Sequence, residues 1–390
     1  MKTRKKEVLA AQTGNVPAGA RSTDQQHNLN INMKQHILTV FALCGAMTAL
    51  AQQAPEKTGP KLTISGYAEA YYVFDFNKPD NHTRPGFLYN HTRHNELNIN
   101  LAYLKANYSA DRVRGNVAIM AGTYAQYNMA SEQELVRHIY EANAGVRIGK
   151  GLWVDAGILP SHIGFESATG KDNFTLTRSL MAENSPYYEA GAKISWTPND
   201  KWLFAAMYLN GWQRIKRPDA NQTPGFGSQI TYKPTGKVTL NWSTFIGNDK
   251  PDSVRQMRYF SDLYGTFALT DKLSLIAGLD IGAEKKGKDV DGMNAWYAPI
   301  LIARYAFTDK IAMAGRYEYY NDADGVIIAT GTPNGFRNSG YSLNLDVSPV
   351  SQVMFRLEGK LYNSKNGIFL KGESPRKENF SIATSLAFSF

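Results

Sequence analysis

The sequence predicts an all-β chain that closes into a transmembrane antiparallel up-and-down β-barrel of about sixteen strands. Three observations predict this fold: apolar and polar side chains alternate from residue 62 to the C-terminus, short and long connections alternate, and ionised side chains share the face opposite the apolar one. Alternation with a period of two places each set of side chains on its own face of a strand.

The alternation is clearest in three segments, residues 341–347, 238–246 and 380–390. In the first, Tyr341, Leu343, Leu345 and Val347 share one face, opposite Ser342, Asn344 and Asp346. The pattern predicts strands near residues 62–76, 95–108, 112–126, 138–148, 152–160, 187–197, 201–211, 225–233, 237–247, 256–269, 272–283, 295–307, 311–320, 339–348, 352–363 and 379–390. A count of 14 or 18 strands remains open, and residues 131–138 are compatible with a short helical turn.

Every second connection is tight and rich in turn-forming residues, as in Gly149-Lys150-Gly151, Pro198-Asn199-Asp200 and Thr308-Asp309-Lys310. The connections between them are longer and polar. An outer-membrane barrel has this asymmetry, with short periplasmic turns and long extracellular loops. A soluble sandwich shares the two-residue period but gives no reason for such regular alternation.

The polar face carries charges that a packed interior would not tolerate unpaired. The side chains expected to face the lumen are Glu69, Arg114, Glu189, Lys193, Asp280, Arg304, Arg316, Glu318, Arg356, Glu358 and Lys360. Both signs occur on adjacent strands, which favours a hydrated lumen without strong ion selectivity. Lys105 breaks the pattern, because it is in phase with Leu97 and Ile99 and is therefore expected near the lipid rim.

The N-terminus is predicted to be a targeting segment. Met33 and Lys34 precede an uncharged run, residues 37–51, and Ala49-Leu50-Ala51 is a small-x-small cleavage site before Gln52. The expected organisation is a non-native extension (1–32), a Sec signal peptide (33–51) cleaved between Ala51 and Gln52, a short periplasmic segment (52–61) and the barrel (62–390). Cys44, the only cysteine, leaves a lipoprotein signal as an alternative.

The net charge of +9 is partly local to the N-terminus. Six of the 43 basic and two of the 34 acidic residues lie within residues 1–51, so the remainder carries +5. No long basic run remains, so nucleic acid is not an expected partner.

Two stretches resemble a known family. Residues 69–79, continuing to 89–96, and residues 178–189 (RSLMAENSPYYE) are similar to the OmpL-like β-barrel porins of Bacteroidota. The resemblance covers about residue 62 to the C-terminus. It implies an outer-membrane barrel and defines no catalytic residues. The C-terminal Leu386, Phe388 and Phe390 also resemble the signal that the barrel-assembly machinery recognises.

The longest connection, residues 161–186, is the third on the long-loop side. In many porins the third loop folds into the lumen, and we expect Glu166, Asp172, Arg178 and Glu183 near a constriction, with a loop outside the mouth as the alternative. The first long loop and the start of the next strand contain a cluster of His82, His91, His94 and Glu96. Hydrogen bonding within that loop is expected there rather than metal binding, since strand spacing separates His91 from His94.

The predicted function is a porin of the bacterial outer membrane, through which small hydrophilic solutes diffuse passively. Its expected partners are outer-membrane lipid, the solutes and the assembly machinery, with a homotrimer left open, and no cofactor is expected. A surface adhesion or scaffold barrel with a plugged lumen is the alternative. An outer-membrane hydrolase is a remoter one, because the sequence contains no Walker A, H-E-x-x-H or G-x-S-x-G motif.

Overall fold

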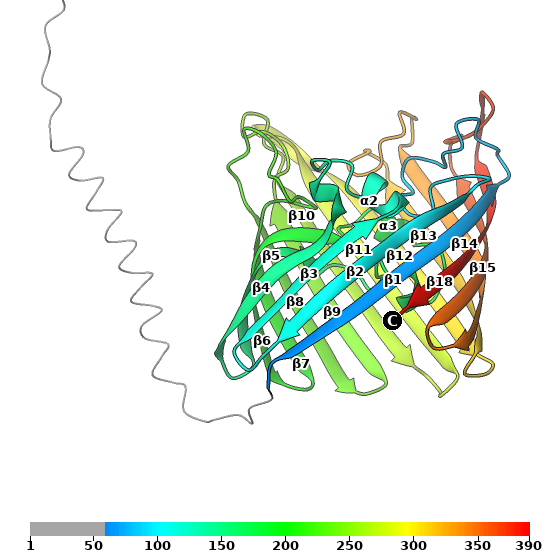
Figure 1. Ribbon diagram of the computed structural model, residues 1–390. Helices are drawn as coiled ribbons and strands as arrows, with labels where there is room; N and C mark the ends of the chain where they lie inside the picture. Colours follow the sequence, from blue (N-terminus) through cyan, green and yellow to red (C-terminus); the bar gives the residue numbers. More distant parts are fainter. Residues whose placement is uncertain (1–58) are drawn as a thin grey trace, which may run out of the picture. The chain divides into compact units, whose positions relative to one another are not determined.

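The computed structural model describes residues 59–390, and these form one closed antiparallel barrel of sixteen strands (Figure 1). The predicted signal peptide, with Ala51 and Gln52, lies outside the described residues. The predicted fold class and strand number are confirmed. The barrel strands are β1 (Lys61–Asp75), β2 (Leu97–Ser109), β3 (Val113–Ala121), β4 (Ile139–Gly149), β5 (Leu152–Pro160), β6 (Tyr188–Asn199), β7 (Trp202–Leu209), β8 (Gly225–Thr235), β9 (Val238–Gly247), β10 (Arg258–Ala268), β11 (Leu273–Gly287), β12 (Val290–Ala306), β13 (Ile311–Asp322), β14 (Phe336–Val350), β15 (Val353–Ser364) and β18 (Glu378–Ser389).

Neighbouring strands in sequence pair with each other, and the first and last close the ring. In the β1–β18 pair, Tyr67 lies opposite Ser389 and Asp75 opposite Ser381. Phe390 adds two backbone hydrogen bonds to Gly66. The connections that join the strands are short at one end of the barrel and longer at the other, as expected (Figure 1).

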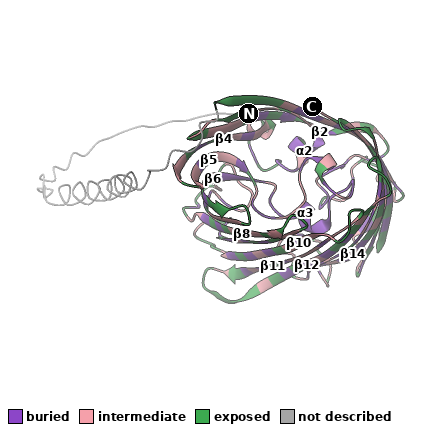
Figure 2. Ribbon diagram, turned by 90° about the horizontal axis from the view of Figure 1, so that it is seen from below, coloured by how far each residue is buried: buried purple, intermediate pink, exposed green. Residues whose placement is uncertain are grey.

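Short elements lie in the longer connections. These are α2 (Thr123–Tyr127), α3 (Leu180–Glu183), two 3₁₀ turns (Val136–His138 and Gly170–Asp172) and a small hairpin, β16 (Phe369–Lys371) with β17 (Ser374–Arg376). Seen along the barrel axis, α2 and α3 lie inside the ring of strands (Figure 2). Among residues 59–390, no helix is long and apolar enough to cross a membrane.

The outer face is apolar and exposed, as the alternation predicts. On β13 to β15, the side chains of Tyr317, Tyr341, Leu343 and Leu357 point outward and are all exposed, whereas Arg316 and Glu358 between them are buried. Aromatic rings gather near the short turns, where Trp202 stacks on Phe204 and Tyr232. This is the arrangement of a wall that meets lipid with an aromatic girdle at its edge.

Two details of the strand prediction are wrong. The strand expected over 112–126 ends at Ala121, because Gly122 has a positive φ of 122° and opens α2. The long connection expected over 284–294 is mostly strand, since β11 and β12 extend and leave only residues 288–289 between them. The short helical turn considered for residues 131–138 is present as the 3₁₀ turn Val136–His138.

Lys105 also lies elsewhere than its phase predicted. The β1–β2 register shifts between Glu69 and Ala70, which pair with Leu101 and Ile99 and leave Asn100 unpaired as a bulge. An extra residue in one strand reverses the faces of all that follow it. Lys105 therefore turns away from lipid, and its Nζ donates to Oε1 of Glu141 at 2.7 Å.

Candidate functional site: a loop inside the barrel

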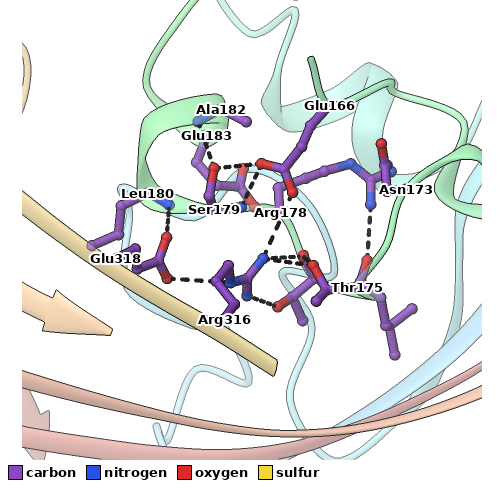
Figure 3. A network of polar contacts seen from close by, with 12 residues as sticks. Glu166, Asn173, Thr175, Arg178, Ser179, Leu180, Ala182, Glu183, Arg316 and Glu318 are labelled. Carbon is purple, nitrogen blue, oxygen red and sulfur yellow. Dashed lines mark hydrogen bonds and ion pairs between the residues drawn. The ribbon is translucent and has the colours of Figure 1, made fainter. Parts of the chain in front are cut away.

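The candidate site is the third loop, residues 161–187, which connects β5 to β6 and lies inside the barrel. Its residues bond to strands β13, β14 and β15, which are far from it in sequence. The polar contacts around Arg316 show how closely the loop and the wall interlock (Figure 3).

Arg316 of β13 holds the middle of the loop. Its guanidinium donates to Oγ1 of Thr175 at 2.8 Å, to the carbonyl of Thr177 at 2.7 Å and to Oγ1 of Thr177 at 2.9 Å. It also pairs with Glu358 of β15 at 3.0 Å, and that carboxylate accepts the Thr177 N–H at 2.5 Å. A buried cation and a buried anion thus satisfy each other and the loop backbone together.

Arg356 and Lys360 of β15 repeat this arrangement on either side. Arg356 donates to the loop carbonyls of Gly170, Asn173 and Thr175 at 2.7, 2.9 and 3.1 Å, and is paired with Asp346 at 2.7 Å. Lys360 donates to the carbonyl of Arg178 at 2.9 Å and lies 2.9 Å from Glu318. Glu318 in turn accepts the N–H of Leu180 at 2.6 Å, so it orients the first turn of α3.

The base of the loop is fixed on the opposite wall. His162 directs Nδ1 to Oε1 of Glu189 at 2.7 Å and Nε2 to the carbonyl of Thr244 at 2.9 Å. Both neighbours accept, so the ring satisfies both as an imidazolium that donates twice. Burial alone would lower the pKa of His162, but the Glu189 carboxylate, the Thr244 carbonyl and Asp262 together raise the pKa above its ordinary value. The N–H of Gly164 donates to Asp262 at 3.1 Å.

The four residues expected at a constriction take different roles. Arg178 is fully buried and donates to the loop's own carbonyls at Ser167, Leu176 and Ala168, so it holds the loop's fold together. Glu166 accepts from the backbone N–H and the hydroxyl of Ser179.

Glu183 connects the third loop to the first. Its carboxylate accepts the backbone N–H groups of Tyr89 at 2.8 Å and Asn90 at 3.2 Å. Burial raises the pKa of Glu183, although these hydrogen bonds oppose the shift. Asp172 is the only exposed member of the four.

The charged wall differs from the expected water-lined surface. Of the eleven predicted lumen-facing charges, eight are buried, and Arg114, Lys193 and Arg304 remain in partial contact with solvent. Most of the buried ones contact a loop or an opposite charge rather than water. Sequence periodicity identified the wall positions but missed the partners, Thr175, Thr177 and His162, because no local pattern marks a loop residue that contacts a distant strand.

The histidine cluster forms hydrogen bonds around the first loop. Nε2 of His91 lies 3.3 Å from the Glu69 carboxylate, and Nδ1 of His94 accepts the Asp75 N–H at 2.9 Å. The pKa of His91 is lowered by its burial, which the Glu69 carboxylate opposes. Within residues 59–390 no group of three or more His, Cys, Asp or Glu side chains has the geometry of a metal site.

Two cavities lie toward opposite ends of the barrel. One of about 250 Å³ is lined by Arg114, Trp153, Lys193 and Gln229 on the side of the short turns. The other, of about 260 Å³, lies among the long loops and is lined partly by Glu183 and Ser185. Gln229 donates to the carbonyl of His162 at 3.3 Å, so a residue that lines the first cavity contacts the start of the third loop.

Apolar side chains from the loops and the wall form a buried cluster inside the barrel. Phe87, Ile163, Leu180 and Met181 from the loops pack against Trp296 and other wall residues in one cluster. The fold and this site together define an outer-membrane porin with a loop folded into its lumen.

Comparison with known proteins agrees. Residues 61–390 match the family described as "Putative beta-barrel porin-2, OmpL-like", and the chain belongs to that family. No curated protein matches the sequence.

Solved structures show the same fold at low identity. The anion-selective porin from Comamonas acidovorans has a TM-score of 0.57 and 8% identity, covering 85% of this chain and 100% of its own. The outer-membrane channel DcaP of Acinetobacter baumannii has a TM-score of 0.57 and 11% identity. OmpT of Vibrio cholerae has a TM-score of 0.55 and 11% identity. Each of these two matches covers 87% of this chain and 100% of the other chain. Membership of a porin family makes the chain a channel of the outer membrane and not an enzyme.

Proposed function

We propose that small hydrophilic solutes diffuse through this barrel along a path that the third loop narrows. One observation carries the proposal: the third loop, which Arg316, Arg356 and Lys360 hold against one wall, lines one cavity directly and contacts, at His162, the Gln229 side chain that lines the other. A solute that passes from one cavity to the other must then pass the loop. The exposed Asp172 and the wall residues Arg114 and Lys193 would line that path.

The test is electrical. Purified protein is refolded in detergent, its folding is checked by heat-modifiable gel migration, and it is inserted into planar bilayers. Stepwise current increases are the expected result.

The same recording tests the second candidate, a scaffold barrel with a closed lumen. The apolar cluster of loop and wall side chains favours this candidate, because it removes cross-section from the pore. A folded barrel that inserts and never conducts would establish it and would refute diffusion.

We also propose that the chain comes from one of the Bacteroidota, as the sequence resemblance implies, and is exported with a Sec signal peptide cut between Ala51 and Gln52. Leu386 and Phe388, exposed on one face of β18, and Phe390, exposed just after the strand ends, would then guide recognition by the barrel-assembly machinery. The N-terminal sequence of the protein in isolated outer membranes tests the cleavage and should begin at Gln52. The amount of barrel in outer membranes from a Phe390→Ala strain tests the assembly signal and should be lower than in wild type.

Association into a homotrimer is a further proposal. Ala144, Ala156 and Ala192 lie opposite one another on β4, β5 and β6, and they leave a flat outward patch on which a second barrel could approach closely. Native mass measurement of the detergent-extracted protein tests it: a mass of three copies is expected, and a single copy would refute it.

A further inference from the structure

The cavity among the long loops has the features of a binding site. It is bordered by the first, second, third, fourth, fifth and seventh of the long connections, and its volume is about 260 Å³. Pockets that recognise small molecules combine an apolar surface with a few fixed polar groups. The groups in this cavity can be divided into those already bonded within the protein and those left available.

The carboxylates are already bonded. Glu183 accepts backbone N–H groups of the first loop, and Oδ1 of Asp249 accepts the Trp212 N–H at 3.1 Å. The Arg258 guanidinium is also engaged, since it donates to Glu284 at 2.6 Å. None of these three charges is left to attract a solute strongly.

Two cations remain available. Arg214 and Lys250 both line the cavity. Within residues 59–390, neither side-chain head group makes a hydrogen bond or an ion pair. The charged groups of the cavity that have no partner within the protein are therefore positive. A guanidinium and an ammonium in one cavity favour a carboxylate ligand.

A rigid ring also lines the cavity: Trp212, whose centroid lies 5.2 Å from the Arg258 guanidinium carbon. Trp212 is held edge-on against Phe245 and Phe260, with ring centroids 5.1 and 4.8 Å apart. Asn184 donates its amide N–H groups to the carbonyls of Phe87 and Leu180, which leaves its side-chain oxygen as an acceptor for a hydroxyl group. An aromatic surface suits the C–H face of a sugar ring, and a fixed amide suits its hydroxyls.

We infer that this cavity binds a sugar acid, a small hydroxylated ring that carries one carboxylate. The carboxylate meets Arg214 and Lys250, and the ring lies against Trp212. The inference deepens the proposed function by naming the solute class, and its role in transport rests on that function.

The experiment uses D-glucuronate as the probe. D-glucose, which has the hydroxylated ring without the carboxylate, and acetate, which has the carboxylate without the ring, are the two comparison ligands. Binding is measured calorimetrically on the refolded barrel in detergent, which does not require an open pore. Glucuronate is expected to bind at least tenfold more tightly than either comparison ligand. The double variant Arg214→Gln with Lys250→Gln is expected to weaken it at least tenfold, because each lost charge-assisted hydrogen bond contributes a factor of that order.

Arg217→Gln is the matched control. Arg217 lies in the same loop as Arg214, donates to the carbonyl of Gln222 and does not line the cavity. Each of three results would overturn the inference: glucose binds as tightly as glucuronate, glucuronate does not bind, or the double variant binds glucuronate as tightly as the Arg217→Gln control does. Bilayer conductance is recorded in parallel. Binding without conductance would refute the transport proposal alone, and conductance without binding would refute this inference alone.

Discussion

Arg356 offers the sharpest test of how the third loop is held. Replacing it with glutamine keeps a polar side chain but removes the guanidinium that joins β15 to three loop carbonyls. The same change leaves Asp346 without its closest cation, because Arg304 lies farther away at 3.9 Å. The loop should therefore detach more often from the wall.

The magnitude follows from the hydrogen bonds and the ion pair that the substitution removes. A hydrogen bond from a charged donor contributes about 1.5–3 kcal/mol, and breaking a buried ion pair costs about 3–5 kcal/mol. The terms overlap and the wall relaxes, so we expect a loss of about 4 kcal/mol in docking free energy. At about 1.4 kcal/mol per factor of ten, the ratio of undocked to docked loop rises about 10³-fold.

Single-channel recording detects this change. The Arg356→Gln barrel should show larger open-channel current noise than wild type, with the same heat-modifiable migration. Arg147→Gln is the control, because it removes a partly exposed pair with Asp111 at a short turn, and such exposed pairs contribute about 0–1 kcal/mol. A folded Arg356→Gln barrel whose conductance and noise match the control would refute the reasoning.

Two further outcomes follow from the same geometry. The ion pair between His162 and Glu189 stabilises the loop base fully in acid, and this stabilisation is lost as pH rises through the raised pKa of His162. Current noise of the wild-type channel should therefore increase above neutral pH, and the Glu189→Gln variant should lose this pH dependence. Identical pH profiles of the two proteins would contradict this. At Gly340 an added Cβ would lie 2.5 Å from Oε1 of Glu318, whereas at Gly315 it would meet open space. Gly340→Ala should therefore lower the free energy of unfolding in urea by about 1–3 kcal/mol and Gly315→Ala by much less, and equal midpoints would oppose the account.

Alternation predicted the wall well, because in a barrel each strand has one face on lipid and every second residue must be apolar. Residues such as Arg356 and Glu358 were assigned to the inner face from this rule alone. The rule failed at Asn100, where a bulge that no residue type announces reversed the face of Lys105. A one-residue register shift is set by the partner strand and by Glu69, which accepts the Asn100 amide at 3.0 Å.

The interior was harder to predict. The length of the third loop pointed to entry into the lumen, but its contacts join residues more than 130 positions apart, as Thr177 and Arg316 show. Charges that the sequence suggested were hydrated are instead bonded to loop backbone. Only the folded chain shows which carbonyls meet which guanidinium.

Asp172 provides the most direct test that the third loop narrows the path. It is exposed, and the predicted mature chain contains no cysteine, so Asp172→Cys would give a single thiol. A bulky charged thiol reagent should then lower the single-channel current, with complete labelling verified by mass. A fully labelled barrel that conducts as before would contradict the account.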